Sequence, residues 1–430
     1  MTVTAFRSAL CTLIDDPAGR RDALVHYPDG LLVVEDGHIR QCGAYGDVAP
    51  TLPEGVTMHH YPGALILPGF IDAHIHFPQI DVMGAYGLQL MDWLERYTFP
   101  CEEAFADPDH ARAAAAFFLD ELLRNGTTSA LVFATVHDAS VEALFSAALD
   151  RQMRLIGGKV LMDRHAPDAL LEPADSGART TDRLIRDWHG RGRLGYAITP
   201  RFAPTSTPEQ LRLAGRLLAE HPNTLLHTHL SENRGEIDLV RDLFPDAADY
   251  LDVYDRAGLV TERSVFAHGI HLSARERRCL TDRGAAIAHC PTSNLFLGSG
   301  LFDLKTADAD GIRVALGTDV GAGTSLSMLA TAGEAYKVAQ LSGSPLNPRR
   351  ALYLATLGSA RALHIADKVG SLEPGKEADF VVIDPGATPL LARRQAACKS
   401  VDEQLFVLFT LGDDRCIAET RLMGASAYRR

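Results

Sequence analysis

The sequence predicts an α/β fold: a (β/α)₈ barrel with a small β-sandwich domain built from both ends of the chain. Two observations predict the barrel. Short apolar runs alternate with helix-like segments at fairly even spacing, and there are eight such runs. The third observation concerns the ends, because strand-and-turn patterns occur in residues 1–65 and again in residues 370–430. We therefore expect one discontinuous β domain from these two segments and a catalytic barrel over residues 66–369.

The two chain ends carry hairpin and turn signals. Leu31–Val34 is an apolar run, Asp36-Gly37 is a two-residue turn, and Ile39–Cys42 returns. A hairpin of this size is not stable alone. Because Gly370–Asp379 forms another turn before the apolar run Phe380–Asp384, we expect the two ends to meet in one small domain.

Eight apolar runs are expected as the barrel strands, and Pro78 ends the first of them. They span Phe70–His76, Ser129–Val136, Leu155–Met162, Tyr196–Thr199, Thr224–His229, Ser264–His268, Ala285–His289 and Val314–Gly317. Between them, Asp107-Pro108 begins a helix that ends at Asn125-Gly126, and Thr207–Gln210 is a capping box for a helix ending at Glu220. No Gly-x-Gly-x-x-Gly follows an early strand, which argues against a doubly wound sheet.

Composition excludes several classes of function. The chain has 430 residues, 46% of them hydrophobic, and a formal net charge of −13, which disfavours a nucleic-acid binder. Its seven cysteines are scattered and form no Cys-x-x-Cys pair, as expected for reduced thiols in the cytoplasm. We expect no signal peptide and no membrane span.

Polar side chains gather where the first expected strand ends. Period 2 places Phe70, Asp72, His74 and His76 on one face, so both imidazoles can bind one metal ion from the same side. An α/β barrel keeps its chemistry at the C-terminal ends of its strands. This His-x-His pair is therefore the first candidate for a metal site.

Other strand ends carry further candidates. His229 and Glu232 lie three residues apart after the fifth strand, so one can bind a metal while the other stands beside it as a proton carrier. His268 ends the sixth strand, and Asp319 follows the eighth. Nitrogen and oxygen ligands of this kind suit Zn²⁺, with Fe²⁺ and Mn²⁺ as alternatives, and zinc can lower the pKa of a water towards ~7.

Each candidate also has a structural interpretation. A single buried histidine is more often core packing than a ligand, and Asp319 also suits a helix cap. The chance that six such groups fall on four separate strand ends by coincidence is about one in twenty. We expect His227 beside the ligands and His289 in a packing or supporting position. Nine further histidines are expected in structural or surface positions: His59, His60, His110, His137, His165, His189, His221, His271 and His364.

These residues resemble the amidohydrolase superfamily of metal-dependent hydrolases. The matching segments are Pro68–His76, His229-x-x-Glu232, Ala267–Gly269, Gly317–Asp319 and Leu372–Asp379, which together span nearly the whole chain. No lysine follows the fourth strand, where a carboxylated lysine would bridge two metal ions. The chain therefore resembles the mononuclear deaminase branch of the superfamily.

Within that branch the chain is similar to the guanine deaminase family. The similar segments are Phe77–Gln79, Trp93–Pro100, Pro200–Pro204, His229–Asn233 and Cys290–Leu295. One departure is His227, which stands where a neutral polar residue is expected. The glutamate three residues after His229 nevertheless indicates that His229 is the ligand.

The resemblance implies zinc-dependent hydrolysis of guanine at C2 to xanthine and ammonia. The implied metal ligands are His74, His76, His229 and Asp319. Asp319 would accept the proton of the attacking water while His268 positions that water. Glu232 would protonate ring nitrogen N3 and later the departing amine. All three of these groups are expected to contact the substrate.

The resemblance also implies residues that recognise the base. The Gln79 amide suits a donor–acceptor edge, the Arg201 guanidinium suits the O6 acceptor, and Phe202 would pack on the flat base. The structural alternatives are a salt bridge at the barrel rim for Arg201 and core packing for Phe202. Trp93 and Tyr97 are expected as pocket wall or core. A homodimer is a further implication.

Two rival functions remain at this stage. The first is another aminohydrolase of the same superfamily, acting on 8-oxoguanine, a nucleoside, a pterin or a triazine. Its metal and acid–base residues would be the same, so only Gln79, Arg201 and Phe202 discriminate. The second is an inactive scaffold of the same fold, which the complete set of ligand candidates disfavours.

Overall fold

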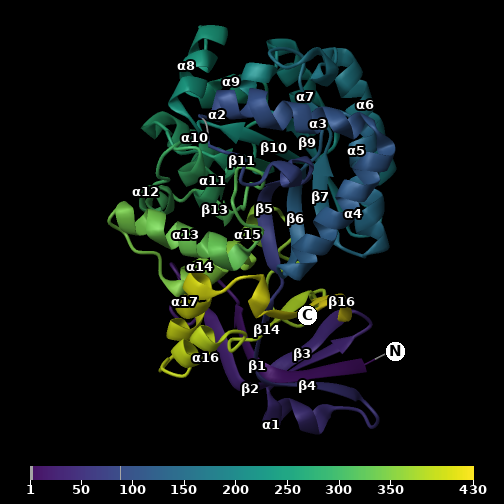
Figure 1. The fold of residues 1–430 in the computed structure, drawn as a ribbon, viewed down its shortest axis with the longest axis vertical. Helices are drawn as coiled ribbons and strands as arrows, with labels where there is room; N and C mark the ends of the chain where they lie inside the picture. Colours follow the sequence, from purple (N-terminus) through teal and green to yellow (C-terminus); the bar gives the residue numbers. More distant parts are fainter. Residues whose placement is uncertain (1–2, 88) are drawn as a thin grey trace.

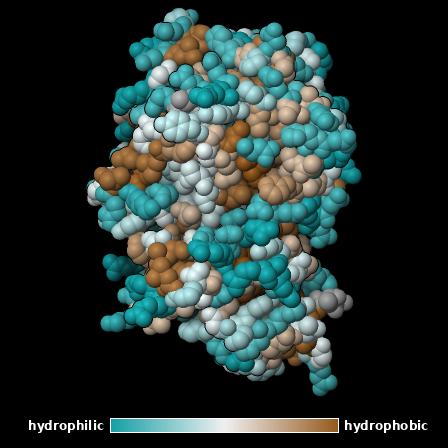
Figure 2. Space-filling view, viewed as in Figure 1, coloured by the Kyte–Doolittle hydropathy of each residue, from teal (hydrophilic) through white to brown (hydrophobic). Residues whose placement is uncertain are grey.

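The barrel and a separate mixed sheet lie at opposite ends of the molecule, and both chain termini lie at the sheet's end (Figure 1). The computed structural model describes residues 3–87 and 89–430. Among the helices in these ranges, none is both long and apolar enough to cross a membrane. Hydrophilic side chains cover most of the face shown in Figure 2, and hydrophobic ones form smaller groups among them.

The barrel consists of parallel strands in the order β13-β12-β11-β10-β9-β7-β6-β5, with β8 paired to β9. The strands are β5 (Phe70–His76), β6 (Thr127–Phe133), β7 (Arg154–Gly158), β8 (Val160–Leu161), β9 (Leu194–Pro200), β10 (Leu225–Leu230), β11 (Ser264–His268), β12 (Ala286–His289) and β13 (Arg313–Leu316). The predicted barrel is confirmed, and the third expected strand is divided into β7 and β8.

Backbone hydrogen bonds close the barrel between β5 and the residues after β13. The amide of Asp319 donates to the carbonyl of His74 at 2.9 Å, and the amide of His76 donates to the carbonyl of Val320 at 2.8 Å. These two hydrogen bonds hold the end of β5 beside the residues that follow β13. The candidate residues on both strands are thereby brought together.

Helices surround the barrel (Figure 1). The helices that connect and follow its strands are α4 (Pro108–Arg124), α5 (Asp138–Asp150), α6 (Ala174–Trp188), α7 (Pro208–Glu220), α8 (Arg234–Leu243), α9 (Tyr250–Arg256), α10 (Ala274–Arg283), α11 (Pro291–Phe296), α12 (Leu304–Ala309), α13 (Met328–Leu341), α14 (Pro348–Ala355) and α15 (Leu357–Ala362). A series of short helices joins β5 to α4: η2 (Phe77–Val82), α2 (Leu90–Trp93), the π-helix η3 (Leu94–Thr98), α3 (Phe99–Glu103) and η4 (Ala104–Ala106).

The predicted ends of α4 and α7 are confirmed, whereas the predicted capping box of α7 is only half formed. The Asp107 side chain accepts from the amide of Asp109 and caps α4. At α7 the Thr207 side chain accepts from the Gln210 amide, but the reciprocal half of the capping box is not formed. The Gln210 side chain instead accepts from Ser206 Oγ at 2.7 Å, while the Thr207 amide donates to Asp163.

The second sheet combines strands from both ends of the chain. Its order is β16-β15-β14-β4-β1-β2-β3. The strands are β1 (Val3–Leu13), β2 (Leu24–Glu35), β3 (His38–Ala44), β4 (Thr57–Pro68), β14 (Phe380–Ile383), β15 (Ile417–Leu422) and β16 (Ala425–Arg429). The predicted hairpin turn joins β2 to β3, with Asp36 and Gly37 both at positive φ.

Two short helices also belong to the C-terminal segment. They are α16 (Pro389–Gln395) and α17 (Val401–Leu411), between β14 and β15. These two helices were not predicted from the sequence. Two smaller elements lie between β3 and β4, namely α1 (Tyr45–Val48) and η1 (Ala49–Thr51). The barrel loops contain η5 (Asp168–Leu170) and η6 (Ala203–Thr205), and η7 (Asp414–Cys416) lies just before β15.

Candidate active site

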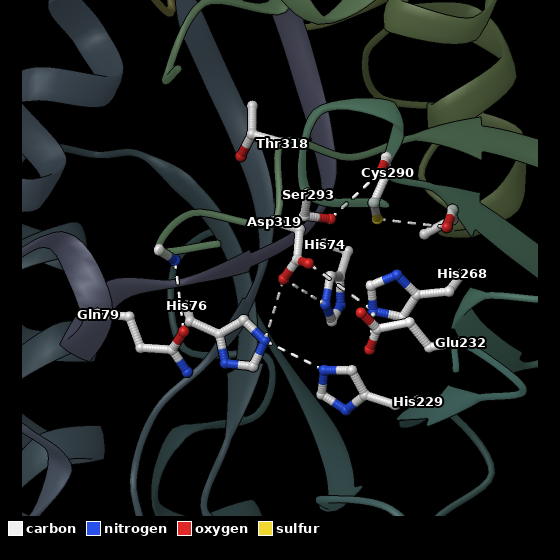
Figure 3. A network of polar contacts seen from close by, with 12 residues as sticks. His74, His76, Gln79, His229, Glu232, His268, Cys290, Ser293, Thr318 and Asp319 are labelled. Atoms are coloured by element: carbon white, nitrogen blue, oxygen red, sulfur yellow. Dashed lines mark hydrogen bonds and ion pairs between the residues drawn. The ribbon is translucent and has the colours of Figure 1, made fainter. Parts of the chain in front are cut away.

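The candidate residues meet at the C-terminal mouth of the barrel (Figure 3). His76 Nε2 lies 3.2 Å from His229 Nε2 and 3.4 Å from Asp319 Oδ1. His74 Nε2 lies 3.1 Å from the same carboxylate oxygen. Strands β5 and β10 and the turn after β13 thus bring three imidazoles and one carboxylate to a single point.

Glu232 and His268 lie beside this group. Glu232 Oε2 is 3.3 Å from His268 Nε2, which lies 3.8 Å from Asp319 Oδ2. His74, His229, His268 and Asp319 each offer one ligand atom, and these atoms all lie within 4.8 Å of one another. The structure therefore brings together all six groups that the sequence placed at the strand ends.

A β-bulge in β5 corrects the predicted alternation of that strand. The register against β6 shifts between Asp72 and Ile75, so one extra residue is inserted there. Ile71 and Ala73 pack inside the barrel in a cluster to which every main barrel strand contributes, whereas Phe70 and Ile75 pack in the larger cluster that includes the surrounding helices. Strict alternation along the whole strand was wrong, but the prediction that His74 and His76 share a face is confirmed. The bulge allows Ile71 and Ala73 to face the barrel interior as well.

The outer nitrogens of the imidazoles are held by hydrogen bonds. His229 Nδ1 donates to the carbonyl of Arg201 at 2.7 Å, and His268 Nδ1 donates to Asn294 Oδ1 at 2.8 Å. Each bond fixes the tautomer and leaves the Nε2 lone pair facing the centre. His74 Nδ1 lies 2.7 Å from His227 Nε2, so His227 stands behind a candidate ligand.

The donor set fits a divalent metal ion. His74 Nε2 is buried and has no hydrogen-bond partner among the residues that the structure describes. Burial holds the pKa of His74, His76 and His229 well below the usual value, so these rings are neutral and can donate a lone pair. Neutral imidazoles with one carboxylate are ligands typical of zinc and related metals.

The backbone before Asp319 is anchored to β5. The Asp72 carboxylate accepts from the Thr318 amide at 3.0 Å and from Thr318 Oγ1 at 2.5 Å. Asp319 has φ 52° and His268 has φ 71°, a left-handed conformation that is costly for residues with a side chain. Such strain persists only where the surrounding contacts impose it, and here it aims both side chains into the site.

Burial sets the protonation of the proton-carrier candidate. Glu232 is 3% exposed, and burial raises its pKa to about 7. Ser299 Oγ donates to its Oε1 at 3.1 Å and holds the side chain in place. For His268 burial opposes the charged form, but the carboxylates of Glu232 and Asp319 outweigh it and raise the pKa. Glu232 can therefore both accept and release a proton near neutral pH.

A pocket opens above these groups. It is lined by His76, Gln79, Leu90, Trp93, Leu94, Arg201, Phe202, His229, Glu232, His268, Leu297, Asp319 and Ala322. The three side chains expected to recognise the base thus line the same cavity as the acid–base residues. Trp93, expected as wall or core, lies in this wall.

Glu102, a buried polar residue behind this wall, was not among the predicted site residues. Its carboxylate contacts the side chains of both Gln79 and Arg201, so the expected rim salt bridge of Arg201 exists as a buried pair. Glu102 lies two residues after the Trp93–Pro100 segment. Nothing in an acidic pair at the end of a short helix distinguished it from a solvated surface residue.

His289 does not reach the cavity. Its ring stacks on Phe302, with the ring centroids 4.7 Å apart, and it is 1% exposed. The histidines expected elsewhere include His59, stacked on Phe6, and His221, which contacts Asp182 at 2.8 Å. These contacts agree with structural positions outside the cavity.

Known proteins resemble this chain over almost its whole length. The profile of the Amidohydrolase family matches residues 65–425. The guanine deaminase of Escherichia coli (strain K12) is 51% identical over 417 residues, which cover 97% of this chain and 95% of that protein.

Solved structures agree with the sequence relatives. The structure of E. coli guanine deaminase has a TM-score of 0.97 at 48% identity, with 100% of both chains covered. The guanine deaminase of C. acetobutylicum, solved with guanine bound in its active site, has a TM-score of 0.90 at 30% identity and covers 99% of this chain and 100% of its own. The chain therefore belongs to the amidohydrolase family and, within it, to the guanine deaminases.

Proposed function

We propose that the protein is a zinc-dependent guanine deaminase, which hydrolyses guanine at C2 to xanthine and ammonia. The observation that carries the proposal is the joint lining of one cavity. Three of the four candidate metal ligands (His76, His229 and Asp319) face it. A carboxyl group with a pKa of about 7 and the side chains expected to recognise the base face it as well. Water supplies the oxygen that replaces the exocyclic amine, and the amine leaves as ammonia.

The proposed metal ligands are His74, His76, His229 and Asp319. A bound zinc ion supplies a Lewis acid that makes a water molecule acidic enough to attack at neutral pH. The neutral rings and the fixed tautomer of His229 suit this role. Imidazole nitrogens predominate among the donors, which favours zinc over Mn²⁺, while Fe²⁺ also binds imidazole and stays the alternative metal.

The acid–base roles follow from position and pKa. Asp319 accepts a proton from the attacking water, and His268 holds that water by hydrogen bonding. Glu232 donates a proton to N3, which makes C2 more electrophilic. It then takes the proton of the new C2 hydroxyl group and passes it to the departing amine, and the proton accepted by Asp319 restores Glu232 to its starting state. Its pKa of about 7 suits repeated gain and loss of a proton.

Three side chains of the cavity are proposed to recognise the purine. Arg201 donates to O6, the Gln79 amide pairs with the adjacent ring edge, and Phe202 packs on the flat base. Phe202 is 3% exposed and belongs to an apolar cluster with Trp93 and Leu297. This cluster gives the cavity an apolar wall for a planar ligand.

Incubation of the zinc-loaded protein with guanine, followed by ultraviolet absorbance, tests the proposal. We expect guanine to disappear as xanthine forms in equal amount. A parallel panel of 8-oxoguanine, guanosine, a pterin and an aminotriazine tests specificity. Turnover of one of these amines without turnover of guanine would contradict the assignment. A protein that takes up neither zinc nor iron would instead indicate a scaffold.

The proposal extends to a homodimer in the cytoplasm. Its support is the family resemblance and, for the compartment, the seven cysteines, all of which are free thiols. Light scattering at several protein concentrations tests the dimer, and a constant monomer mass would contradict it.

A further inference from the structure

We infer that Glu102 is a positioning residue for substrate recognition, acting through Gln79 and Arg201. The inference rests on the proposed function, because it concerns how the cavity recognises a 6-oxopurine. Glu102 does not line the cavity. It lies on α3, behind the two side chains that do.

The carboxylate of Glu102 joins two segments that are far apart in sequence. Arg201 Nη1 donates to both of its oxygens, at 2.9 and 2.7 Å, and Gln79 Nε2 donates to Oε1 at 3.0 Å. Gln79 lies on η2 after the metal-binding strand, whereas Arg201 follows β9. One carboxylate therefore sets the relative position of both base-recognising groups.

Helix α3 restrains Arg201 from a second side. The guanidinium carbon lies 5.4 Å from the centroid of the Phe99 ring. The Glu102 side chain is 0% exposed and that of Arg201 is 3% exposed. Because both charges are buried, neither can be left unpaired without a large desolvation penalty, so the pair stays together when the cavity changes its contents.

This arrangement leaves a defined set of donors for the substrate. Within the described ranges, the side-chain hydrogen bonds of Arg201 use Nη1, so Nη2 and Nε remain available. The Gln79 amide is oriented by its donation to Glu102 and by the Gly321 amide, which donates to Gln79 Oε1 at 3.4 Å. Glu102 thus fixes which N–H groups face an oxygen acceptor on the base.

Binding of two unreactive purines to the zinc-loaded protein isolates this role. Hypoxanthine carries an oxygen at position 6, and unsubstituted purine does not. We expect Glu102→Gln to weaken hypoxanthine binding about 30-fold, since a charge-assisted hydrogen bond is lost, and to change purine binding less than about 3-fold. Equal weakening of both ligands would overturn the inference, because a residue that only supports the fold would affect both.

A double-variant cycle tests whether Glu102 acts through Arg201. We expect Glu102→Gln combined with Arg201→Gln to bind hypoxanthine no more weakly than Arg201→Gln alone. Additive losses would contradict action through Arg201. Glu377→Gln is the matched control, since this carboxylate is also paired with arginines but lies outside the cavity, and it should keep the hypoxanthine-to-purine ratio of the parent.

Two further measurements keep the inference testable if Glu102→Gln folds poorly. Glu102→Asp retains the charge but is one methylene shorter, and we expect the same selective loss for hypoxanthine. In a crystal structure of the parent protein with hypoxanthine, Arg201 should contact O6 while Nη1 remains on Glu102. A complex in which this pair is broken would overturn the inference. A parent protein that neither deaminates guanine nor prefers hypoxanthine over purine would overturn the proposed function, and this inference with it.

Discussion

At the scale of single residues, the site depends on burial more than on any one contact. The same burial that keeps the candidate metal-binding imidazoles neutral raises the pKa of Glu232 to about 7. A carboxyl group exposed to water would be ionised throughout the neutral range and would donate a proton poorly. The environment therefore gives histidines and glutamate their complementary roles.

Glu232→Gln should separate proton transfer from metal binding. The glutamine keeps the shape of the side chain but cannot carry a proton between N3 and the amine, so we expect kcat for guanine to fall at least ~10²-fold. Zinc content measured by atomic absorption should remain near one ion per chain. His74→Ala should lose both zinc and activity. Near-normal turnover in Glu232→Gln would refute its role.

His289 should contribute to the loss of stability in acid. Burial lowers its pKa to about 3, so below pH 6.5 the unfolded chain binds a proton that the folded protein does not. Its folded pKa is depressed, and the protein therefore loses free energy of unfolding as the pH falls. Between pH 7 and pH 5 the loss from this one residue is about 2 kcal/mol.

Urea unfolding of the parent and of His289→Gln at the two pH values measures this contribution. The variant removes the titrating group, so its free energy of unfolding should fall less between pH 7 and pH 5. Contributions of the other groups cancel in the comparison. An equal loss of the free energy of unfolding in the two proteins would show that the pKa of His289 is not lowered in the folded state.

At the scale of elements, the close approach of β5 and the end of β13 determines where Asp319 lies. A Cβ atom added to Gly317 would lie 3.0 Å from His74 Cβ and 3.1 Å from the His74 amide nitrogen. Neither strand can easily move, because backbone hydrogen bonds join them directly after this contact. Glycine therefore allows the first and last barrel strands to meet here without displacing either.

Gly317→Ala should weaken metal binding. The added methyl group pushes the two strands apart by a few tenths of an ångström and displaces Asp319 from the histidines, so we expect zinc affinity to fall ~10-fold or more. Competition with a chromophoric chelator measures this change. Gly19→Ala is the control, because its added Cβ meets no atom within 4 Å and its zinc affinity should be that of the parent. Unchanged affinity in Gly317→Ala would contradict the argument.

The sequence predicted the strands and helices better than it predicted their local irregularities. Apolar periodicity sufficed for the eight strands and for the ends of α4, because these patterns are local. It failed at the β5 bulge, since an inserted residue is visible only against the neighbouring strand. The α7 capping box failed because Asp163, distant in sequence, replaced the predicted partner of Thr207.

The candidate site was predictable as far as its residues end strands. His74, His229 and Asp319 follow apolar runs, and the barrel brings strand ends to one mouth. Glu102 was not predictable in this way, because its importance arises from burial against Gln79 and Arg201. Such contacts join segments whose proximity no local pattern records.

At the scale of the whole molecule, buried charges join the barrel to the segment that enters the mixed sheet. Arg154 begins β7, Arg193 precedes β9, and both contact Glu377. Arg193 also contacts Asp379, whose carbonyl accepts from the Gly69 amide at 3.0 Å. This network lies at the N-terminal ends of the barrel strands, opposite the candidate site.

Glu377→Gln should lower stability without affecting catalysis. Removing one partner from a buried ion pair leaves arginine charge uncompensated, which costs about 3 kcal/mol. We expect a lower melting temperature in calorimetry and a kcat/KM for guanine within about 2-fold of the parent value. A large loss of kcat/KM in a protein that keeps its melting temperature would contradict this separation of stability from activity.

The composition of the mixed sheet has a consequence for the synthesis of the chain. Strand β4 lies between β1 and β14 in the sheet, yet β14 is translated only after the whole barrel. Until then the β4 edge of the nascent protein presents unpaired backbone groups, which can pair with strands of other chains. When residues 380–383 emerge from the ribosome they pair with β4 and cover this edge, and β15 and β16 then extend the sheet. Ribosomes that stall before this point therefore release products in which the β4 edge is exposed.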